Sequence, residues 1–136
     1  MGLTILDADV LIGVLNRNDA QHQKARRVIM DVLTEVPERA ISAMTMAEVM
    51  VGPMARGDAA GEEARLFIQG LRAEIVPLDE AGARLAASIR VRTGVKMPDA
   101  CVLATAIHMR GRHPGPVTIT SFDKRLLRAW RAVEAG

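Results

Sequence analysis

The stretch Leu3-Thr4-Ile5-Leu6-Asp7 decides the fold, because a short run of apolar, β-compatible residues ends abruptly at an acid. Such a run predicts a buried strand. A second apolar run, Val10–Leu15, follows almost at once and predicts a helix. A strand that leads directly into a helix is the first half of a strand-helix-strand unit in an α/β protein.

The alternation of strand and helix continues along the whole chain. Further strands are expected at residues 39–41, 74–77 and 117–120. Helices are expected from the cap Asp19 to Pro37, from Ser42 or Thr45 to a stop at Gly52-Pro53, from Glu62 to Leu71, from the cap Asp79 to Arg92, and from Asp99 to Met109. This order predicts one α/β domain over residues 1–136, with a mostly parallel central sheet of four to five strands flanked by helices. Ligands of such sheets bind at the carboxyl ends of the strands.

Composition sets broad limits on the protein. Its 136 residues are 49% hydrophobic and 25% charged, which is typical of one folded domain. No apolar run approaches the roughly 18 residues of a membrane-spanning helix, and no basic segment begins the chain, so a cytoplasmic location without a membrane partner is expected. The single cysteine, Cys101, lies in an apolar helical stretch and is expected to pack in the core.

Charge and aromatic content limit the ways in which the chain can bind nucleic acid. Residues 1–68 carry 7 basic and 10 acidic side chains, whereas residues 69–136 carry 11 and 6, so the second half is basic. This weakly favours a polyanionic partner. Aromatic residues make up only 2% of the chain and tyrosine is absent, which argues against a platform for stacking bases. Any nucleic acid is therefore expected to be held mainly through phosphate.

Four acids lie beside apolar residues, where a charge is costly to bury unless it is paired or bound to a metal. Asp7 ends the first strand, Glu48 lies within an apolar helix, Asp99 opens another, and Asp123 follows the last strand. Asp7, Asp99 and Asp123 can each also be explained as a residue that stabilises a helix start. Glu48 has no such explanation, and the set as a whole favours a shared site.

The ligand types favour a hard divalent cation. Carboxylates without histidine or cysteine partners suit Mg²⁺ or Mn²⁺ better than zinc. The histidines, His22, His108 and His113, show no spacing typical of zinc sites.

The order of these motifs resembles that of the PIN-domain family, and in particular the VapC-type ribonuclease toxins of bacterial toxin–antitoxin pairs. The resemblance covers nearly the whole chain. It depends on residues 5–12 around Asp7, residues 42–52 around Glu48, Pro98-Asp99-Ala100, and Thr120-Ser121-Phe122-Asp123.

The resemblance implies a function and a set of site residues. The family's core acids fall on Asp7, Glu48 and Asp99, its usual fourth acid on Asp123, and its hydroxyl on Ser121. In the family these acids hold Mg²⁺ or Mn²⁺ and hydrolyse RNA to products with a 5′-phosphate. The resemblance also implies a homodimer and a small VapB-type antitoxin that inserts a basic residue into the acidic site.

The chain departs from the family pattern just after the first acid. The family usually has threonine or serine and then asparagine or serine, whereas this chain has Ala8 and Asp9. Asp9 can be a fifth ligand, a supporting acid behind the ligands, or a helix cap; the last two are favoured.

Two further groups of side chains have both a functional and an ordinary interpretation. Basic residues of the second half are candidates for phosphate contacts, although most are expected simply to be solvated: Arg90, Arg92, Lys96, Arg110, Arg112, Lys124 and Arg125. Met46, Met50 and Met54 recur at helical spacing and are expected to pack in the core rather than to meet a partner.

Two rival functions fit part of the sequence. Asp7-Ala8-Asp9 also resembles the opening of haloacid-dehalogenase-like phosphatases. Those enzymes need a lysine and a later acidic pair that are well separated from each other, whereas Lys96 is only three residues before Asp99. Glu48 would also have no role in such an enzyme. The second rival is a PIN scaffold that binds RNA or protein without cutting. The presence of all core acids favours an enzyme.

Overall fold

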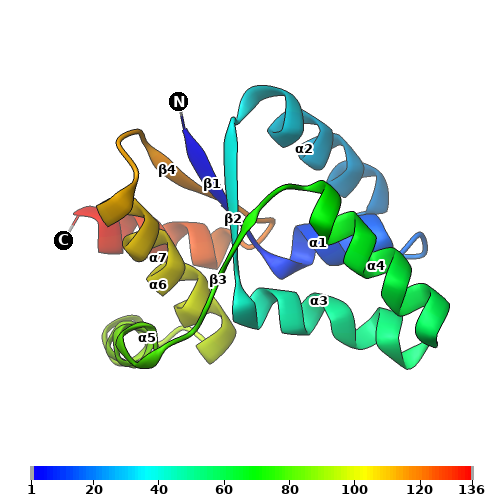
Figure 1. The fold of residues 1–136 in the computed structure, drawn as a ribbon. Coiled ribbons are helices and arrows are strands. Elements are labelled where there is room, and N and C mark those ends of the chain that lie inside the picture. The colour runs from blue at the N-terminus through cyan, green and yellow to red at the C-terminus, as the bar shows by residue number, and fades with distance from the viewer. Residues whose placement is uncertain (1, 136) are drawn as a thin grey trace.

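The strands that the sequence predicts pair in parallel, in a computed structural model that describes residues 2–135 (Figure 1). The sheet has four strands in the order β3-β2-β1-β4: β1 (Leu3–Leu6), β2 (Glu38–Ser42), β3 (Glu74–Val76) and β4 (Val117–Thr120). The helices are α1 (Ala8–Leu15), α2 (His22–Glu35), α3 (Ala43–Ala55), α4 (Asp58–Gly70), α5 (Glu80–Thr93), α6 (Met97–Arg112) and α7 (Lys124–Ala135). Within the described range, no helix combines the length and apolar character needed to cross a membrane.

Strand β1 is the centre of the sheet and is buried along its whole length. It pairs with β2 on one side and β4 on the other, with Leu3 opposite both Glu38 and Val117. A central parallel strand is covered on both faces, which explains why its residues are all apolar or small rather than alternating with charged ones.

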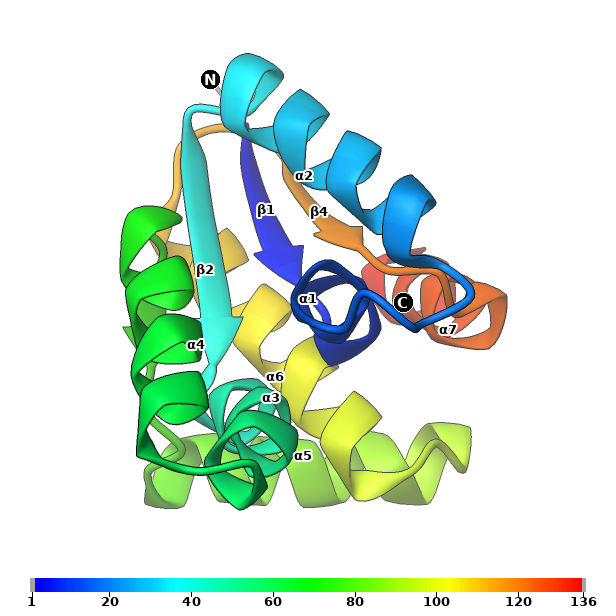
Figure 2. The ribbon, with the colours of Figure 1, turned by 90° about the vertical axis from the view of Figure 1, so that its right-hand side faces the viewer.

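Helices cover both faces of the sheet (Figures 1 and 2), and each face contributes to its own hydrophobic cluster. On one face, Leu3 and Ile5 pack with α5, α6 and α7. On the other, Leu6 packs with α1, α2, α3 and α4. The sheet is therefore a rigid support whose carboxyl edge opens between the two helical layers.

The order of strands reverses between β1 and β4. After β1 the chain passes through α1 and α2 to the neighbouring β2, whereas β4 is added on the other side of β1. The segments that follow β1 and β4 meet at this point, where the Asp7 N–H donates to the Thr120 carbonyl at 3.0 Å. Such a reversal is where sheets of this kind bind ligands.

Two predicted boundaries of helices are wrong. Asp19 does not cap α2, which begins at His22; its carboxylate instead accepts the Gln21 N–H within the preceding turn. Gly52-Pro53 does not stop α3, which continues to Ala55. A proline in the last turn removes only one hydrogen bond, and Pro53 is buried, so its packing offsets that loss.

The next two helices begin earlier than predicted. Helix α4 begins at Asp58 rather than Glu62, because Gly57 has a φ of 118° and lets the chain reverse immediately after α3. Helix α6 begins at Met97 rather than Asp99 and runs on to Arg112, since Pro98 fits the first turn, where its missing N–H costs nothing.

Side-chain predictions are mostly confirmed in this fold. Cys101 is buried, and Met46 and Met50 pack against the cluster that contains Leu6. Met54 is an exception, because it lies at the far end of α3 and is 65% exposed.

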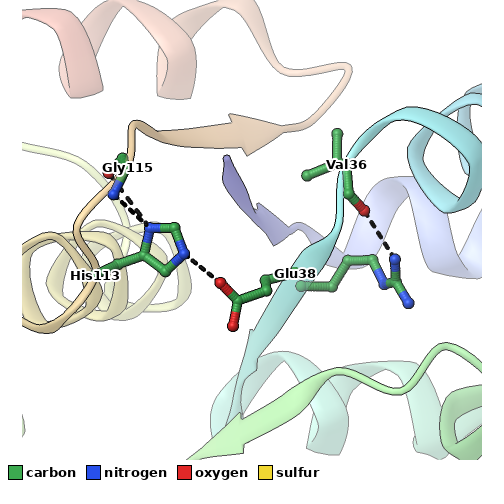
Figure 3. Close-up of polar contacts among 5 residues, drawn as sticks. Val36, Glu38, His113 and Gly115 are labelled. Carbon is green, nitrogen blue, oxygen red and sulfur yellow. Dashed lines mark hydrogen bonds and ion pairs between the residues drawn. The ribbon is translucent and has the colours of Figure 1, made fainter. Parts of the chain in front are cut away.

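At the amino edge of the sheet, opposite the carboxyl edge, polar contacts join the loop before β4 to β2 (Figure 3). His113, in the loop before β4, donates from Nε2 to the Glu38 carboxylate of β2. Its Nδ1 accepts the Gly115 N–H at 3.1 Å, an arrangement that keeps the ring proton on Nε2. These contacts tie the loop after α6 to the sheet.

Helices α1 and α2 approach closely at Gly13. A Cβ atom built there would lie 2.8 Å from the Ala25 Cβ, which is shorter than side-chain carbons tolerate. We expect Gly13→Ala to lower the free energy of unfolding by about 1–3 kcal/mol, because overpacking exceeds the gain in helix propensity. Gly52→Ala in α3 is the control: the nearest atom to its Cβ is a mobile arginine nitrogen 3.7 Å away, so it should be neutral or stabilising. Urea denaturation of both variants measures the difference, and equal stabilities would contradict the close approach.

Candidate functional site

Asp7 lies where the carboxyl ends of β1 and β4 meet, and it is only 8% exposed. Its Oδ1 accepts the Ala8 N–H at 2.8 Å and so caps α1, while its Oδ2 accepts the Ser121 hydroxyl at 2.7 Å. The helix cap predicted as an alternative is therefore present. It does not exclude a ligand role, because each carboxylate oxygen has a second lone pair.

Residues 121–123, here called the Ser121 turn, connect β4 to α7. The Ser121 Oγ accepts the Asp123 N–H at 3.0 Å while donating to Asp7. The Asp123 Oδ1 accepts the N–H groups of Arg125 and Leu126 at 2.9 and 3.2 Å, so this acid also caps a helix, as the alternative interpretation predicted. The serine hydroxyl thus links the two acids that follow the strands.

Glu48 and Asp99 come from the helices that cover this edge. Glu48 lies in the second turn of α3 and Asp99 in the first turn of α6, and both side chains are half-buried. Burial raises the pKa of Glu48, and the charges of Asp7 and Asp99 raise it further. Burial also raises the pKa of Asp99, with additional contributions from Asp7 and Asp123.

The same mutual repulsion extends to the acids after β1. Burial raises the pKa of Asp7, hydrogen bonds from Ser121 and Ala8 oppose this, and the charge of Asp123 adds to the rise. Burial and the charge of Asp7 raise the pKa of Asp9 to about 6. The acids predicted from the sequence therefore form one electrostatically coupled group at the strand ends, although their roles stay predictions.

Asp9 has contacts that sequence reasoning did not find. Its Oδ2 accepts the backbone N–H of Phe122 at 3.0 Å, and the Ser121 Oγ lies 3.3 Å from the same oxygen. Its Oδ1 is buried and has no hydrogen-bond partner among residues 2–135. No local pattern reveals a contact between residues 113 positions apart.

The structure separates the basic candidates for phosphate contact. The charges of Lys96 and Arg125 lower the pKa of Asp99, which places both beside the acids. In contrast, Arg112 pairs with Glu74 at 3.2 Å, and Arg110 lies over the Trp130 ring. Lys96 and Arg125 are therefore the candidates that border the acidic group.

The acidic group fits a hard cation by its donor type. Its donors are carboxylate and hydroxyl oxygens. After burial, the charges of neighbouring acids raise the pKa of Glu48 and Asp99, and a divalent cation would neutralise those charges. Over residues 2–135, however, no group of three or more histidine, cysteine, aspartate or glutamate side chains is arranged so that it could hold a metal ion. The acids therefore match Mg²⁺ by donor type and not by a preformed set of ligands.

Two of the hollows in the described chain lie away from the acidic group and do not indicate a second site. One, of about 260 Å³, lies at the amino edge of the sheet, and its lining includes the charged pairs Arg112–Glu74 and His113–Glu38. The other, of about 200 Å³, lies between α5 and α6 and is lined mainly by apolar side chains. The second hollow contains one acid, Asp79, whose carboxylate caps α5 by accepting the Gly82 N–H.

The raised pKa values predict how pH affects the metal-free protein. Asp9 binds a proton more tightly in the folded state, with a pKa of about 6 against 3.8, so its ionisation opposes folding above about pH 6. That penalty is relieved as pH falls from about 6 towards 4. We expect Asp9→Asn, in EDTA, to be stabilised less than the native protein over this fall in pH. Denaturation by urea at both pH values measures the change; the exposed Asp58→Asn is the control, and a native-like profile for Asp9→Asn would contradict the assignment.

Several solved structures have the same fold, and some of them are described as toxins or toxin–antitoxin complexes. A toxin–antitoxin complex from Klebsiella pneumoniae is 23% identical, with a TM-score of 0.67 over 88% of this chain and 86% of that one. The sarcin-ricin loop cleaving toxin VapC20 from Mycobacterium tuberculosis is 20% identical, with a TM-score of 0.73 over 93% and 94%. FitAcB from Neisseria gonorrhoeae is 20% identical, with a TM-score of 0.62 over 94% and 93%.

At these identities the solved structures establish the likeness of fold. No curated protein sequence matches the chain significantly. The profile of the PIN domain matches residues 4–131, a range that includes all of β1 except Leu3, the four acids predicted as ligands, and Ser121. On this match and its four-stranded parallel sheet, the chain belongs to the PIN-domain family.

Proposed function

We propose that this protein is a metal-dependent endoribonuclease of the VapC type, the toxin of a toxin–antitoxin pair. The observation that carries the proposal is the coupled group of acids: Asp7, Glu48, Asp99 and Asp123 come from four separate segments. Burial raises the pKa of Asp7, Glu48 and Asp99, and the charge of a neighbouring acid of the group raises each of them further. The fold by itself does not require acids that repel one another. Acids with perturbed pKa values cluster at functional sites.

The residues proposed to hold Mg²⁺ or Mn²⁺ are Asp7, Glu48, Asp99 and Asp123. When bound, the cation supplies positive charge for the phosphate and lowers the pKa of water. Ser121 holds the Asp7 carboxylate in place through its 2.7 Å hydrogen bond, and its oxygen is itself held by the Asp123 N–H. This arrangement fixes both acids without removing the lone pairs that face the edge.

RNA cleavage by these residues is a hydrolysis at phosphorus. The oxygen of water attacks the phosphorus, and its proton passes to one of the carboxylates. The bond from phosphorus to the 3′ oxygen breaks, which leaves a 5′-phosphate on one product and a 3′ hydroxyl on the other, protonated from solvent. Lys96 and Arg125 are proposed to bind phosphates beside the one that is cut.

The proposal extends to partners. Structures similar to this chain are described as toxin–antitoxin complexes, including VapBC2 from Rickettsia felis, 15% identical with a TM-score of 0.65. We therefore propose a VapB-type antitoxin as the partner of this chain, and a homodimer as its own assembly.

Activity should depend on both the metal and Asp7. We expect the purified protein to cut a cellular RNA pool into discrete products with Mg²⁺ or Mn²⁺, and to lose this activity in EDTA. Asp7→Asn should reduce the rate at least about 100-fold, because several kcal/mol of charge stabilisation is lost. Asparagine also caps helices, so the variant should fold.

The exposed Asp31→Asn on α2 is the matched control and should cut normally. Cleavage that persists in EDTA or in Asp7→Asn would sink the proposed chemistry. Binding of Mn²⁺ without any cleavage would favour the alternative, a PIN scaffold that binds RNA or a protein without cutting.

The basic residues at the rim should act through phosphate. We expect Lys96→Gln and Arg125→Gln each to weaken binding of single-stranded RNA and to reduce the slope of log Kd against log salt by about 0.7. Arg112→Gln, at the opposite edge of the sheet, should leave the slope unchanged. Filter binding from low to moderate salt measures the slopes, and equal slopes for all three variants would contradict the assignment.

A further inference from the structure

The carboxylate of Asp9 joins two segments that are far apart in the sequence. Asp9 lies in the first turn of α1, yet its Oδ2 accepts the Phe122 N–H of the Ser121 turn at 3.0 Å. The Ser121 Oγ is 3.3 Å from the same oxygen. The second carboxylate oxygen, Oδ1, is enclosed by protein and has no hydrogen-bond partner in the described part of the chain. The side chain is thus held at the junction rather than extended into solvent.

A role at the start of the helix does not account for this position. Asp7 already caps α1 through the Ala8 N–H. An acid that serves only the helix dipole can remain in solvent, as Asp58 does in the first turn of α4. Asp9 instead gives up solvation to bond to a distant backbone, which costs free energy unless that bond has its own use.

The bond to Phe122 fixes the Ser121 turn from one side, and the core fixes it from the other. The Phe122 ring packs against the cluster that contains Leu6, and the Lys24 ammonium lies 4.9 Å from the ring centre. With its backbone held by Asp9 and its ring held by the core, Phe122 has little freedom. Its neighbour Ser121 is therefore aimed at the Asp7 carboxylate.

The positions of Asp7 and Asp123 depend on this orientation of Ser121. The Ser121 hydroxyl donates to the Asp7 Oδ2 and accepts the Asp123 N–H, so a shift of the turn moves the partner of both acids. We infer that Asp9 is a positioning residue: it clamps the Ser121 turn onto the start of α1 and thereby orients Asp7 and Asp123 for the cation. This inference rests on the proposed function, since it names the support of the same site.

Two substitutions separate the position of the acceptor from its charge. Asp9→Asn keeps an oxygen at the same distance and removes the charge. Asp9→Glu keeps the charge, but its extra methylene must displace an oxygen that is enclosed by protein. Both changes are small enough to allow folding. Asp58→Asn in α4 is the matched control for loss of an acid from the first turn of a helix.

Two measurements apply to each variant without reference to RNA cleavage. Hydrogen exchange of the Phe122 amide reports the clamp directly, and calorimetry reports the affinity for Mn²⁺. We expect Asp9→Asn to keep Phe122 protected and to bind Mn²⁺ within about threefold of the native protein. We expect Asp9→Glu to lose that protection and to bind Mn²⁺ about 10-fold or more weakly, the usual effect of losing support behind a ligand.

The opposite ranking, with Asp9→Glu near native and Asp9→Asn severely weakened, would overturn the inference, because it would make the charge of Asp9 the feature that matters. Native-like Mn²⁺ binding in both variants would also overturn it. A native protein that binds no Mn²⁺ would contradict the proposed function instead, and protection of the Phe122 amide in the two variants would still decide whether Asp9 is the clamp.

Discussion

The buried carboxylate of Asp7 is the constraint on which the rest of the site depends. It stands at the end of a central strand, where water is largely excluded, and a charge there requires hydrogen bonds and a compensating partner. The start of α1 and the Ser121 turn provide the hydrogen bonds. The surrounding acids make compensation harder rather than easier. The hydrogen bonds of the Asp7 carboxylate are satisfied within the fold, but the negative charge of the site is not compensated. Uncompensated negative charge is what is expected of a cation site.

Much of this arrangement could be predicted from the sequence because the signals are local. A short apolar run that ends at Asp7 indicates a strand end, and an acid within an apolar helix marks Glu48. Parallel pairing then brings such ends to one edge without further information. The coupling of these acids follows from the topology, and the topology follows from alternating strands and helices. The family profile matches the same range of residues.

The parts that could not be predicted depend on distance or on the ends of helices. The left-handed Gly57 lets α4 begin early, and a helix that keeps a buried Pro53 in its last turn looks broken in the sequence. The sequence alone does not distinguish the roles of Lys96 and Arg112. Lys96 lies beside Asp99, whereas Arg112 is paired with Glu74 at the opposite edge of the sheet. The contact between Asp9 and Phe122 could not be found at all, because nothing near either residue indicates the other.

That last contact has a consequence for how the molecule is assembled. Asp9 and Phe122 are separated by 113 residues, and nearly the whole domain, including the segments with Glu48 and Asp99, lies between them. A contact of such long sequence separation is costly to form early, since the entropy lost in closing the loop is compensated only when β1 and β4 pair in the sheet. Any incompletely folded form of the chain therefore lacks the joined acids. Partly folded or truncated copies contain the same carboxylates without the geometry that unites them.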